Sequence, residues 1–320
     1  MTRNIRAGGE AIRRYILNNI DREGIAAHTA EHFGITRQAA NYHLHKLTEE
    51  KALVPTGNTR GRSYKLAALK SWSFVYPITP ELAEDVVWTR AIHPLISTLP
   101  ENVLNIWNFG FTKIFNNAID HSGGTTIFVT VSKTAIDTQI SIMDNGVGIF
   151  VKIQKAFNLL DERHALLELS KGMLTTDPVK HSGWGIFFTS RMMENFDILS
   201  GKVYFSHEFR SDEDWILERP PSIEGTMAFM KLDNHTARTT KKIFDKFKGN
   251  DSFGFKKTIV PVKLAQYGND QLVSRSQAKR VLARVELFDT ILFDFTDVQT
   301  IGHAFADEIF RVFAQAHPSI

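Results

Sequence analysis

Three short segments in the middle of the chain carry residue types suited to binding a nucleotide. They span residues 111–122, 144–149 and 182–186. The first contains Asn117, whose amide oxygen is a hard ligand suited to Mg²⁺, an ion that keeps several waters and bridges substrate phosphates. The second begins with Asp144, whose carboxylate can accept the amino proton of an adenine. Together these residues predict a site for a purine nucleotide and its metal ion.

The elements that must position these groups can be inferred from the same segments. The apolar spacing of residues 111–119 predicts a helix with one buried face, and Asn117 lies beside that face. Gly146 and Gly148 let the backbone after Asp144 pass close to a flat ring. Two further glycines, Gly183 and Gly185, open an apolar helix at residues 186–193, and the free N–H groups at a helix start can hold phosphate.

Each segment alone also has an ordinary structural explanation. Asn-Gly is first of all a hairpin turn, a lone asparagine is commonly a helix-surface amide, and Gly-x-Gly before a helix commonly serves packing. The nucleotide interpretation depends on all three segments in this order. It also depends on the strand pair expected at residues 126–131 and 139–143, between the first two segments.

The three segments resemble the N, G1 and G2 boxes of the GHKL ATP-binding fold. This fold is shared by gyrase B subunits, heat-shock chaperones, histidine kinases and anti-sigma-factor kinases. Gly225 and Thr226, followed by an apolar strand, resemble the closing Gly-Thr strand of that fold, whose threonine sits near the adenine-binding aspartate. The resemblance covers residues 80–233 and implies ATP and Mg²⁺ as cofactors.

By this resemblance Asn117 is the Mg²⁺ ligand and Asp144 anchors the adenine. Residues 150–181 correspond to the mobile ATP lid, with Lys171 and Lys180 as phosphate contacts, and the alternative for both lysines is a solvated charged loop. The residues expected to contact the cofactor are Asn117, Asp120, Asp144, Gly146, Gly148, Lys171, Lys180, Gly183, Gly185 and Thr226.

One position departs from the GHKL pattern. Hydrolytic and serine-kinase members carry glutamate as general base four residues before the N-box asparagine, and this chain has Lys113 there. A charged lysine cannot accept a proton, although it can act as a counter-charge to phosphate. We therefore expect nucleotide binding, expect slow or absent turnover, and assign no catalytic residue.

The first 70 residues differ in charge from the rest of the chain. They hold 12 Lys and Arg against 6 Asp and Glu, a net charge of +6, whereas the remaining residues have a net charge of −3. Helices are expected at residues 10–20, 29–33 and 37–47, and Thr36 is the expected N-cap of the third. A hairpin with a basic tip follows at residues 53–66.

This pattern resembles the winged helix-turn-helix of bacterial regulators, with a recognition helix at 37–46 and a wing at 58–62. The inward face of the helix is Ala40, Leu44 and Leu47. Side chains on its outward face and on the wing can reach bases and phosphates. The expected DNA-binding residues are Arg37, Gln38, Asn41, Tyr42, His45, Arg60 and Arg62. A solvated surface or a protein-docking module are the alternatives.

The last part of the chain alternates strand, helix, strand and helix, with strands at 258–262 and 290–295. The second strand is fully apolar and is expected to be buried in a parallel sheet. This unit resembles the STAS-like relatives of anti-sigma-factor antagonists. Antagonists carry a phosphorylatable serine after that strand, where this chain has Gly302 and His303. Gly302 is expected at a left-handed turn or a close approach, and His303 at a helix start.

Composition bounds the class of protein. Zero cysteines exclude disulfides, thiolate zinc sites and cysteine nucleophiles. No apolar run approaches the roughly 18 residues of a membrane span, and the first residues lack the apolar core of a signal peptide. We expect a cytoplasmic protein without membrane segments.

We therefore predict a multidomain α/β chain. Its parts are a winged helix-turn-helix at 1–70, a linker at 71–80, a GHKL (Bergerat) α/β sandwich at 81–233, a connector at 234–254 and a small STAS-like domain at 255–320.

The predicted function is an ATP-binding, DNA-binding regulator in which the nucleotide state biases the two outer domains. The alternatives are an anti-sigma-type serine/threonine kinase or ATPase, and an ATP-gated protein-interaction switch. DNA is the partner expected for the head and a protein the partner expected for the tail. Resemblance to GHKL proteins implies a homodimer.

Overall fold

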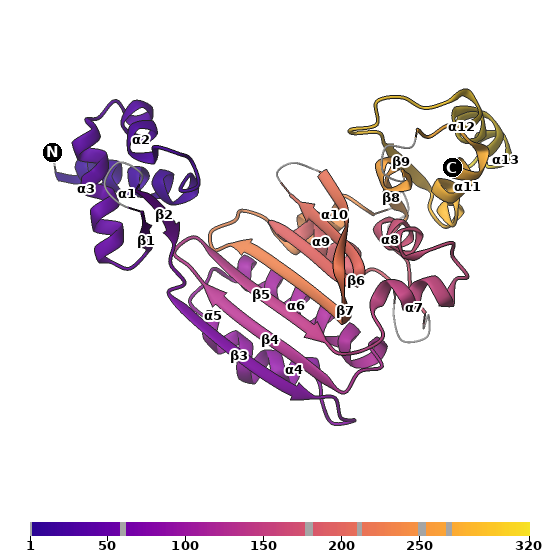
Figure 1. Cartoon of the computed structure of the whole chain (residues 1–320), viewed down its shortest axis with the longest axis horizontal. Helices are drawn as coiled ribbons and strands as arrows, with labels where there is room; N and C mark the ends of the chain where they lie inside the picture. Colours follow the sequence, from indigo (N-terminus) through magenta and orange to yellow (C-terminus); the bar gives the residue numbers. More distant parts are fainter. Residues whose placement is uncertain (1, 58–61, 177–181, 210–212, 249–253, 267–270) are drawn as a thin grey trace. The chain divides into compact units, whose positions relative to one another are not determined.

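The computed structural model describes residues 2–57, 62–176, 182–209, 213–248, 254–266 and 271–320 (Figure 1). The chain is a multidomain α/β protein that divides into two compact units. The first comprises residues 1–73, 130–139 and 233–235, and the second comprises 74–129, 140–232 and 236–320. Within the described ranges, no helix combines the length and the apolar character needed to cross a bilayer.

The first unit contains three helices and an antiparallel hairpin. These are α1 (Thr2–Asn18), α2 (Ile25–Phe33), α3 (Arg37–Glu49), β1 (Leu53–Thr56) and β2 (Ser63–Leu66). As predicted, Thr36 is the N-cap of α3, and its Oγ1 accepts a hydrogen bond from the Ala39 N–H at 3.2 Å. Ala40, Leu44 and Leu47 of α3 face inward and are at most 3% exposed. Ala135, between β4 and β5, packs against this core.

A five-stranded sheet, most of whose residues belong to the second unit, has the strand order β3-β4-β5-β7-β6. The strands are β3 (Lys70–Pro77), β4 (Thr126–Lys133), β5 (Asp137–Asp144), β6 (Asn195–Glu208) and β7 (Glu213–Asp233). The last two strands are antiparallel, with register shifts at Gly201. In β4, buried Ile127, Val129 and Val131 alternate with exposed residues, so one face of the sheet carries the core.

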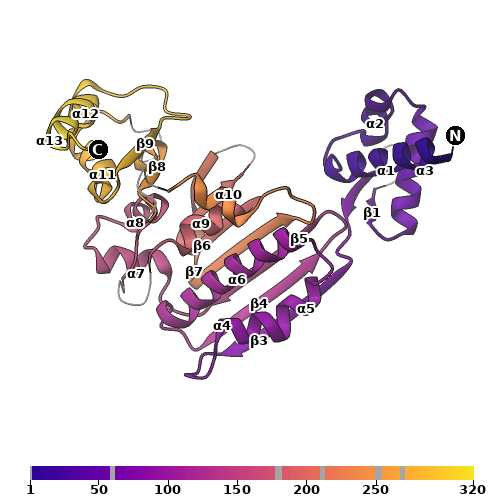
Figure 2. The same ribbon diagram turned by 180° about the vertical axis from the view of Figure 1, so that it is seen from behind.

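Helices cover that face of the sheet (Figures 1 and 2). They are α4 (Glu84–Val87), η2 (Trp88–Ile92), α5 (His93–Ile96), α6 (Glu101–His121) and α9 (Gly185–Met192). The longest, α6, has Trp107, Phe111 and Phe115 fully buried. The predicted strands at 126–131 and 139–143 and the predicted helix at 186–193 are confirmed within a few residues.

The expectation of a linker at 71–80 is wrong for most of that stretch, because residues up to Pro77 belong to β3. β3 is the edge strand of the sheet. Proline is tolerated on an edge strand because its missing N–H need not pair. Trp72, Phe74 and Tyr76 alternate with exposed residues along the strand.

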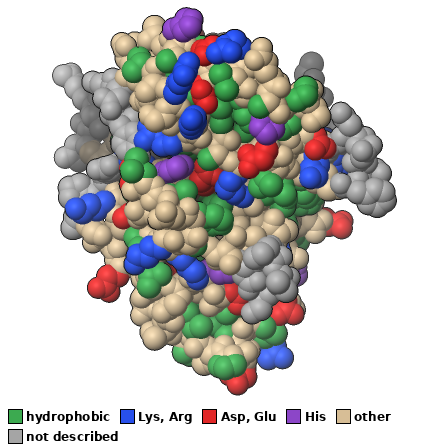
Figure 3. Space-filling view, turned by 90° about the vertical axis from the view of Figure 1, so that its right-hand side faces the viewer, with side chains coloured by type: hydrophobic (Ala, Val, Ile, Leu, Met, Phe, Trp, Pro, Cys, Tyr) green, Lys and Arg blue, Asp and Glu red, His purple; other side chains and the backbone are tan. Residues whose placement is uncertain are grey.

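A C-terminal module, which we define as residues 254–320, forms part of the second unit. Its elements are β8 (Lys257–Pro261), η3 (Val262–Ala265), α11 (Arg275–Leu282), η4 (Val285–Leu287), β9 (Thr290–Asp294), α12 (His303–Asp307), η5 (Glu308–Phe313) and α13 (Ala314–Ala316). The predicted order of strand, helix, strand and helix is confirmed, and β8 and β9 are parallel. On the face drawn in Figure 3, hydrophobic side chains are interspersed among charged ones of both signs.

Two details of this module differ from expectation. β9 is not fully buried, since Leu292 is 52% exposed. The strand pairs with β8 alone in the described sheet, and Thr290 and Leu292, at alternate positions on it, are exposed. Gly302 has φ of −78°, which excludes a left-handed turn. It is instead a close approach, because a Cβ there would lie 2.8 Å from the Cα of Val273.

Candidate functional site

A cavity of about 310 Å³ lies in the second unit and is lined by residues from all three chemistry-bearing segments. The first segment contributes Asn117 from α6, and the second contributes Asp144 from the end of β5. The third contributes Ser182, Gly183 and Gly185 at the start of α9. The volume is in the range of small-molecule pockets. The structure thus brings Asn117, Asp144, Gly183 and Gly185 into one cavity.

Asp144 is a buried carboxylate held by backbone donors. Its side chain is 5% exposed, and Oδ1 accepts the N–H of Gly146 at 2.9 Å and the N–H of Thr226 at 3.3 Å. Burial raises the pKa of Asp144, and these two N–H donors oppose that rise. The carboxylate therefore has a fixed orientation, which suits it to accept a hydrogen bond from a ligand amine.

The glycines around Asp144 are required by the chain's own close approaches. A Cβ on Gly146 would collide with the carbonyl of Ser122, and one on Gly225 (φ +74°) would collide with the carbonyl of Asp144. On Gly148 (φ +86°) it would meet the Ser200 hydroxyl at 2.7 Å. Gly146 and Gly148 do not line the cavity. Their role is to let the loop pack against α6 and β7, which differs from the expected approach to a ligand ring.

Thr226 lies where the resemblance placed it, beside the aspartate. Its hydroxyl accepts the Ile149 N–H at 2.9 Å, and its own N–H donates to Asp144. Ser200 donates its hydroxyl to the carbonyl of Gly225 at 3.0 Å. The bonds of Thr226 tie β7 to the end of β5 and the loop after it, and the bond of Ser200 ties β6 to β7. The same wall of the cavity therefore presents a carboxylate, a threonine and the apolar Ala228.

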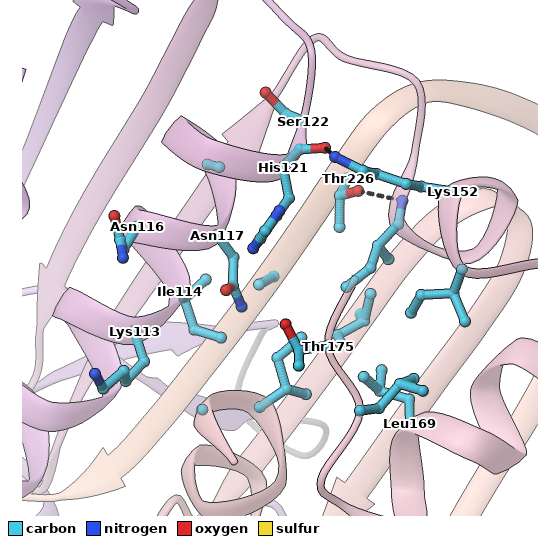
Figure 4. A pocket seen from close by; sticks show the side chains of 18 of the residues that line it. Lys113, Ile114, Asn116, Asn117, His121, Ser122, Lys152, Leu169, Thr175 and Thr226 are labelled. Atoms are coloured by element: carbon cyan, nitrogen blue, oxygen red, sulfur yellow. Dashed lines mark hydrogen bonds between the residues drawn. The ribbon is translucent and has the colours of Figure 1, made fainter. Parts of the chain in front are cut away.

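Asn117 projects into the cavity from α6, together with His121 one helical turn later (Figure 4). Lys152, from α7 (Ile149–Ala156), also lines the cavity and donates from Nζ to the carbonyl of His121 at 2.7 Å. His121 is not among the residues predicted from the sequence, although its spacing of four residues from Asn117 on a helix could have indicated it. Lys152 has no such local signal.

The third segment forms a tight turn into α9. Gly183 has φ of +74°, and a Cβ there would lie 2.6 Å from the backbone of Leu174. Trp184, between the two glycines, is 7% exposed. It packs on Phe188 with ring centroids 5.2 Å apart and on Phe255 at 5.4 Å. Gly183 and Gly185, on either side of this buried indole, line the cavity at the start of α9.

Lys171 does not line the cavity, and the expected phosphate contact is not found. The residue ends α8 (Glu162–Lys171) and is fully buried. Its Nζ donates to Glu168 at 2.6 Å and to the carbonyls of Arg280 at 3.2 Å and Ala283 at 2.7 Å. All three ammonium donors are therefore used within the protein. The expectation failed because a lysine in a polar segment was taken to be exposed.

Three other expected contacts have different outcomes. Asp120 is exposed on α6 and does not line the cavity. Lys180 lies outside the described residues. Lys113, the residue at the general-base position, is exposed and lines the cavity beside Gly185. A cation rather than a carboxylate therefore stands at that edge.

Metal binding at this site would depend on Asn117 and on the ligand. In the part of the chain that the structure describes, no group of three or more His, Cys, Asp or Glu side chains is arranged to hold a metal. Asn117 offers one amide oxygen in the cavity. That donor fits Mg²⁺ in a site completed by phosphate oxygens and water.

A second concavity, of about 1120 Å³, lies in the first unit and is lined by both α3 and β2. Four of the expected DNA-binding residues line it: Arg37, Asn41, His45 and Arg62. Gln38 and Tyr42 are exposed on α3 but lie outside the lining. Arg60 lies outside the described residues. The lining also includes Lys65 and the acidic Asp21 and Glu23.

Comparison with protein families gives a match for the last part of the chain. Residues 277–320 match a family model described as a STAS-like domain of unknown function (DUF4325). The matched residues run from α11 through β9 and α12 to the end of the C-terminal module. This supports the STAS-like resemblance of the tail. No match to the chain was found among curated proteins.

Proposed function

We propose that this protein is an ATP-binding regulator of the GHKL type that contacts DNA through its N-terminal unit. One observation carries the nucleotide assignment, namely that Asn117, Asp144 and the glycines before α9 line one cavity. Asp144 would accept the adenine amino group, the start of α9 would hold phosphate, and Asn117 would complete the coordination of Mg²⁺.

The local structure around Asp144 supports a purine rather than a generic anion. The carboxylate is buried and already carries two backbone N–H donors on Oδ1. A buried carboxylate repels phosphate and discriminates in favour of a donor group on the ligand. Apolar lining residues such as Ile142, Ile198 and Ala228 give a flat ring a surface on which to pack.

The DNA assignment is supported by the exposed polar face of α3. Arg37, Asn41 and His45 lie along one helix and share a concavity with Arg62. Asparagine can pair with adenine and arginine with guanine in the major groove, and basic side chains bind phosphates. The winged helix-turn-helix resemblance and the net charge of residues 1–70 agree with this assignment.

We propose that the C-terminal module binds a protein partner and so transmits the nucleotide state to it. Its STAS-like match is the basis for this part of the proposal. His303 is exposed and opens α12 after Gly302. The position of the antagonist serine is thus occupied by a residue whose expected role is structural, and we propose no phosphorylation of the module.

A kinase or ATPase is the rival function. Such an enzyme needs a base near the terminal phosphate, and the expected position is Lys113. We expect slow or absent ADP formation by the purified protein. Robust ADP formation that is abolished by Asn117→Ala would instead favour the enzyme.

An electrophoretic mobility-shift experiment with and without ATP–Mg²⁺ tests the proposed regulation. We expect DNA binding whose strength differs between the two conditions. DNA binding that is equal in both conditions would contradict nucleotide control, and no DNA binding in either would exclude the DNA role. Function that survives neutralisation of Arg37 and Arg62 would indicate a protein-interaction switch.

A further inference from the structure

Helix α8 contributes residues both to the cavity and to the hydrophobic core of the C-terminal module. Leu169 lines the nucleotide cavity, as do Leu174 and Thr175 just beyond the end of the helix. Leu167, two residues before Leu169, is part of the hydrophobic core of the C-terminal module. By resemblance this segment should be a mobile cover over the nucleotide. Here one side of it is packed into another folded module.

The end of α8 is fixed to the module by a buried ion pair. Glu168 and Lys171 are both 0% exposed, and Lys171 also donates to carbonyls at the end of α11. The Lys171 carbonyl in turn accepts the Thr258 hydroxyl at 2.6 Å from β8. Breaking such a pair leaves a buried charge without its partner, which costs much more than a surface pair. The attachment is therefore strong where the chain enters the cavity wall.

Arg284 extends the attachment to the residues that line the cavity. Its Nη1 donates to Glu168 at 3.2 Å, and its Nη2 donates to the carbonyl of Met173 at 2.7 Å. Met173 immediately precedes Leu174 and Thr175. Arg284 therefore holds the backbone at the point where the chain begins to line the cavity.

Trp184 connects the opposite wall to the same module. It lies between Gly183 and Gly185, and its ring meets Phe255 at 5.4 Å and Phe288 at 6.0 Å. A Cβ on Gly172 would lie 2.6 Å from the indole, so the end of α8 and the turn before α9 touch each other. Both walls on the proposed phosphate side are thus held by one module.

We propose that the C-terminal module positions the phosphate side of the nucleotide site through Lys171, Arg284 and Trp184. This inference rests on the proposed nucleotide binding. The adenine side, around Asp144, is built from β5, β7 and their loops and has no contact of this kind among the described residues. Because coupling is reciprocal, a partner that loosens the module's hold on α8 weakens ATP binding, and ATP weakens that partner by the same factor.

The test uses the full chain and two ligands, ATP with Mg²⁺ and adenosine. The double variant Glu168→Gln/Lys171→Met removes the two fully buried charges together, so neither is left without the other, and Arg284 keeps its bond to the Met173 carbonyl. Arg284→Gln is the second variant, in case the first does not fold, because the Arg284 side chain is 22% exposed. The matched control is Arg311→Met, which removes an exposed ion pair to Asp307 in the same module.

We expect the affinity for ATP to fall about tenfold in the double variant and about fivefold in Arg284→Gln, within the usual range of coupling between sites. The affinity for adenosine should change less than about twofold in either, and Arg311→Met should match the wild type for both ligands. Trp184→Ala should lose ATP affinity, and the conservative Trp184→Phe should retain most of it.

The outcomes separate this inference from the function on which it rests. A wild-type chain that binds neither ligand overturns the proposed nucleotide function. A wild-type chain that binds ATP, with folded variants that bind it equally well, overturns the positioning role alone. Equal losses for ATP and adenosine also overturn that role, because they indicate a general disturbance of the fold.

Discussion

The two concavities of this protein are built in different ways. The proposed nucleotide cavity of the second unit is shaped by backbone, with Asp144 at 5% exposure and glycines where a side chain would collide. The concavity of the first unit is lined by exposed side chains of both charge signs, among them Arg37, Arg62 and Glu23. The first is fixed before any ligand arrives. The second can adjust its side chains to what binds.

This difference predicts two kinds of recognition. A site whose hydrogen-bond acceptor is fixed by buried N–H groups should discriminate sharply by shape and donor position. A site made of exposed charges should bind a polyanion with graded, salt-dependent strength. Substitutions in the cavity should therefore cause large losses of ATP affinity, whereas substitutions in the first unit should cause small, additive losses of DNA affinity.

The largest effect is expected from Asp144→Asn. If the asparagine oxygen keeps the bonds from Gly146 and Thr226, its NH₂ group faces the amino group of the ligand, donor against donor. We expect the affinity for ATP to fall about 10- to 100-fold by calorimetry. Asp120→Asn, on the exposed surface of α6, is the control and should change it less than about twofold. Similar losses in both variants would contradict the assignment of Asp144.

A pair of glycine substitutions tests whether the cavity is fixed by backbone. Gly225 and Gly123 both have positive φ, but only Gly225 has protein atoms where a Cβ would go. Gly123→Ala should lower the free energy of unfolding by about 1–2 kcal/mol, the cost of the left-handed conformation. Gly225→Ala should cost about 1–3 kcal/mol more because of the collision. Urea denaturation measures both, and equal losses would mean that the loop yields easily.

Acidification should weaken ligand binding in the cavity but stabilise the ligand-free protein. Burial raises the pKa of Asp144. Binding an amine donor needs the charged carboxylate, so the affinity for adenosine should fall as the pH falls through that raised pKa. This fall should lie above the ordinary aspartate pKa of about 3.9. The folded chain holds this proton more tightly than the unfolded chain, so protonation should stabilise the ligand-free protein.

Asp144→Asn should remove both pH effects, and the difference between the two proteins isolates them. The measurements are adenosine titrations and thermal unfolding across the acidic range. An affinity that rises on acidification would contradict a charged acceptor at this position.

The smallest effects are expected in the first unit. Arg37→Ala and Arg62→Ala should each reduce the slope of log affinity for DNA against log salt by about 0.9, the value for one phosphate contact. Arg14→Ala, exposed on α1 outside the concavity, should leave the slope unchanged. An unchanged slope in all three variants would place the DNA contacts elsewhere.

The sequence allowed prediction of those features that local patterns determine. The helix carrying Asn117, the strand ending at Asp144 and the inward face of α3 follow from spacing within one element. β3 was missed because two prolines near 77–80 suggested a linker, although aromatic residues at alternate positions indicated a strand. The burial of Lys171 could not be predicted, because the two carbonyls that it binds besides Glu168 lie at the end of α11, far along the chain.

The role of Trp184 has the same explanation. The segment alone gives no reason for so large a side chain between two glycines. Its packing on Phe255 and Phe288, which lie in the C-terminal module, accounts for it. Part of the cavity lining, including Asn117, Asp144 and Thr226, was therefore visible in the sequence, and the attachment of the cavity wall to the tail was not.

The most direct test of the account is a calorimetric titration of the full chain with ATP, with and without Mg²⁺, alongside ADP, a non-hydrolysable analogue and UTP. We predict saturable binding of the adenine nucleotides at one site, tighter with Mg²⁺ and lost in Asp144→Asn, and no binding of UTP. If the chain takes up no adenine nucleotide at concentrations on the order of 1 mM, weaker than most specific binding, then Asn117 and Asp144 do not form a nucleotide site.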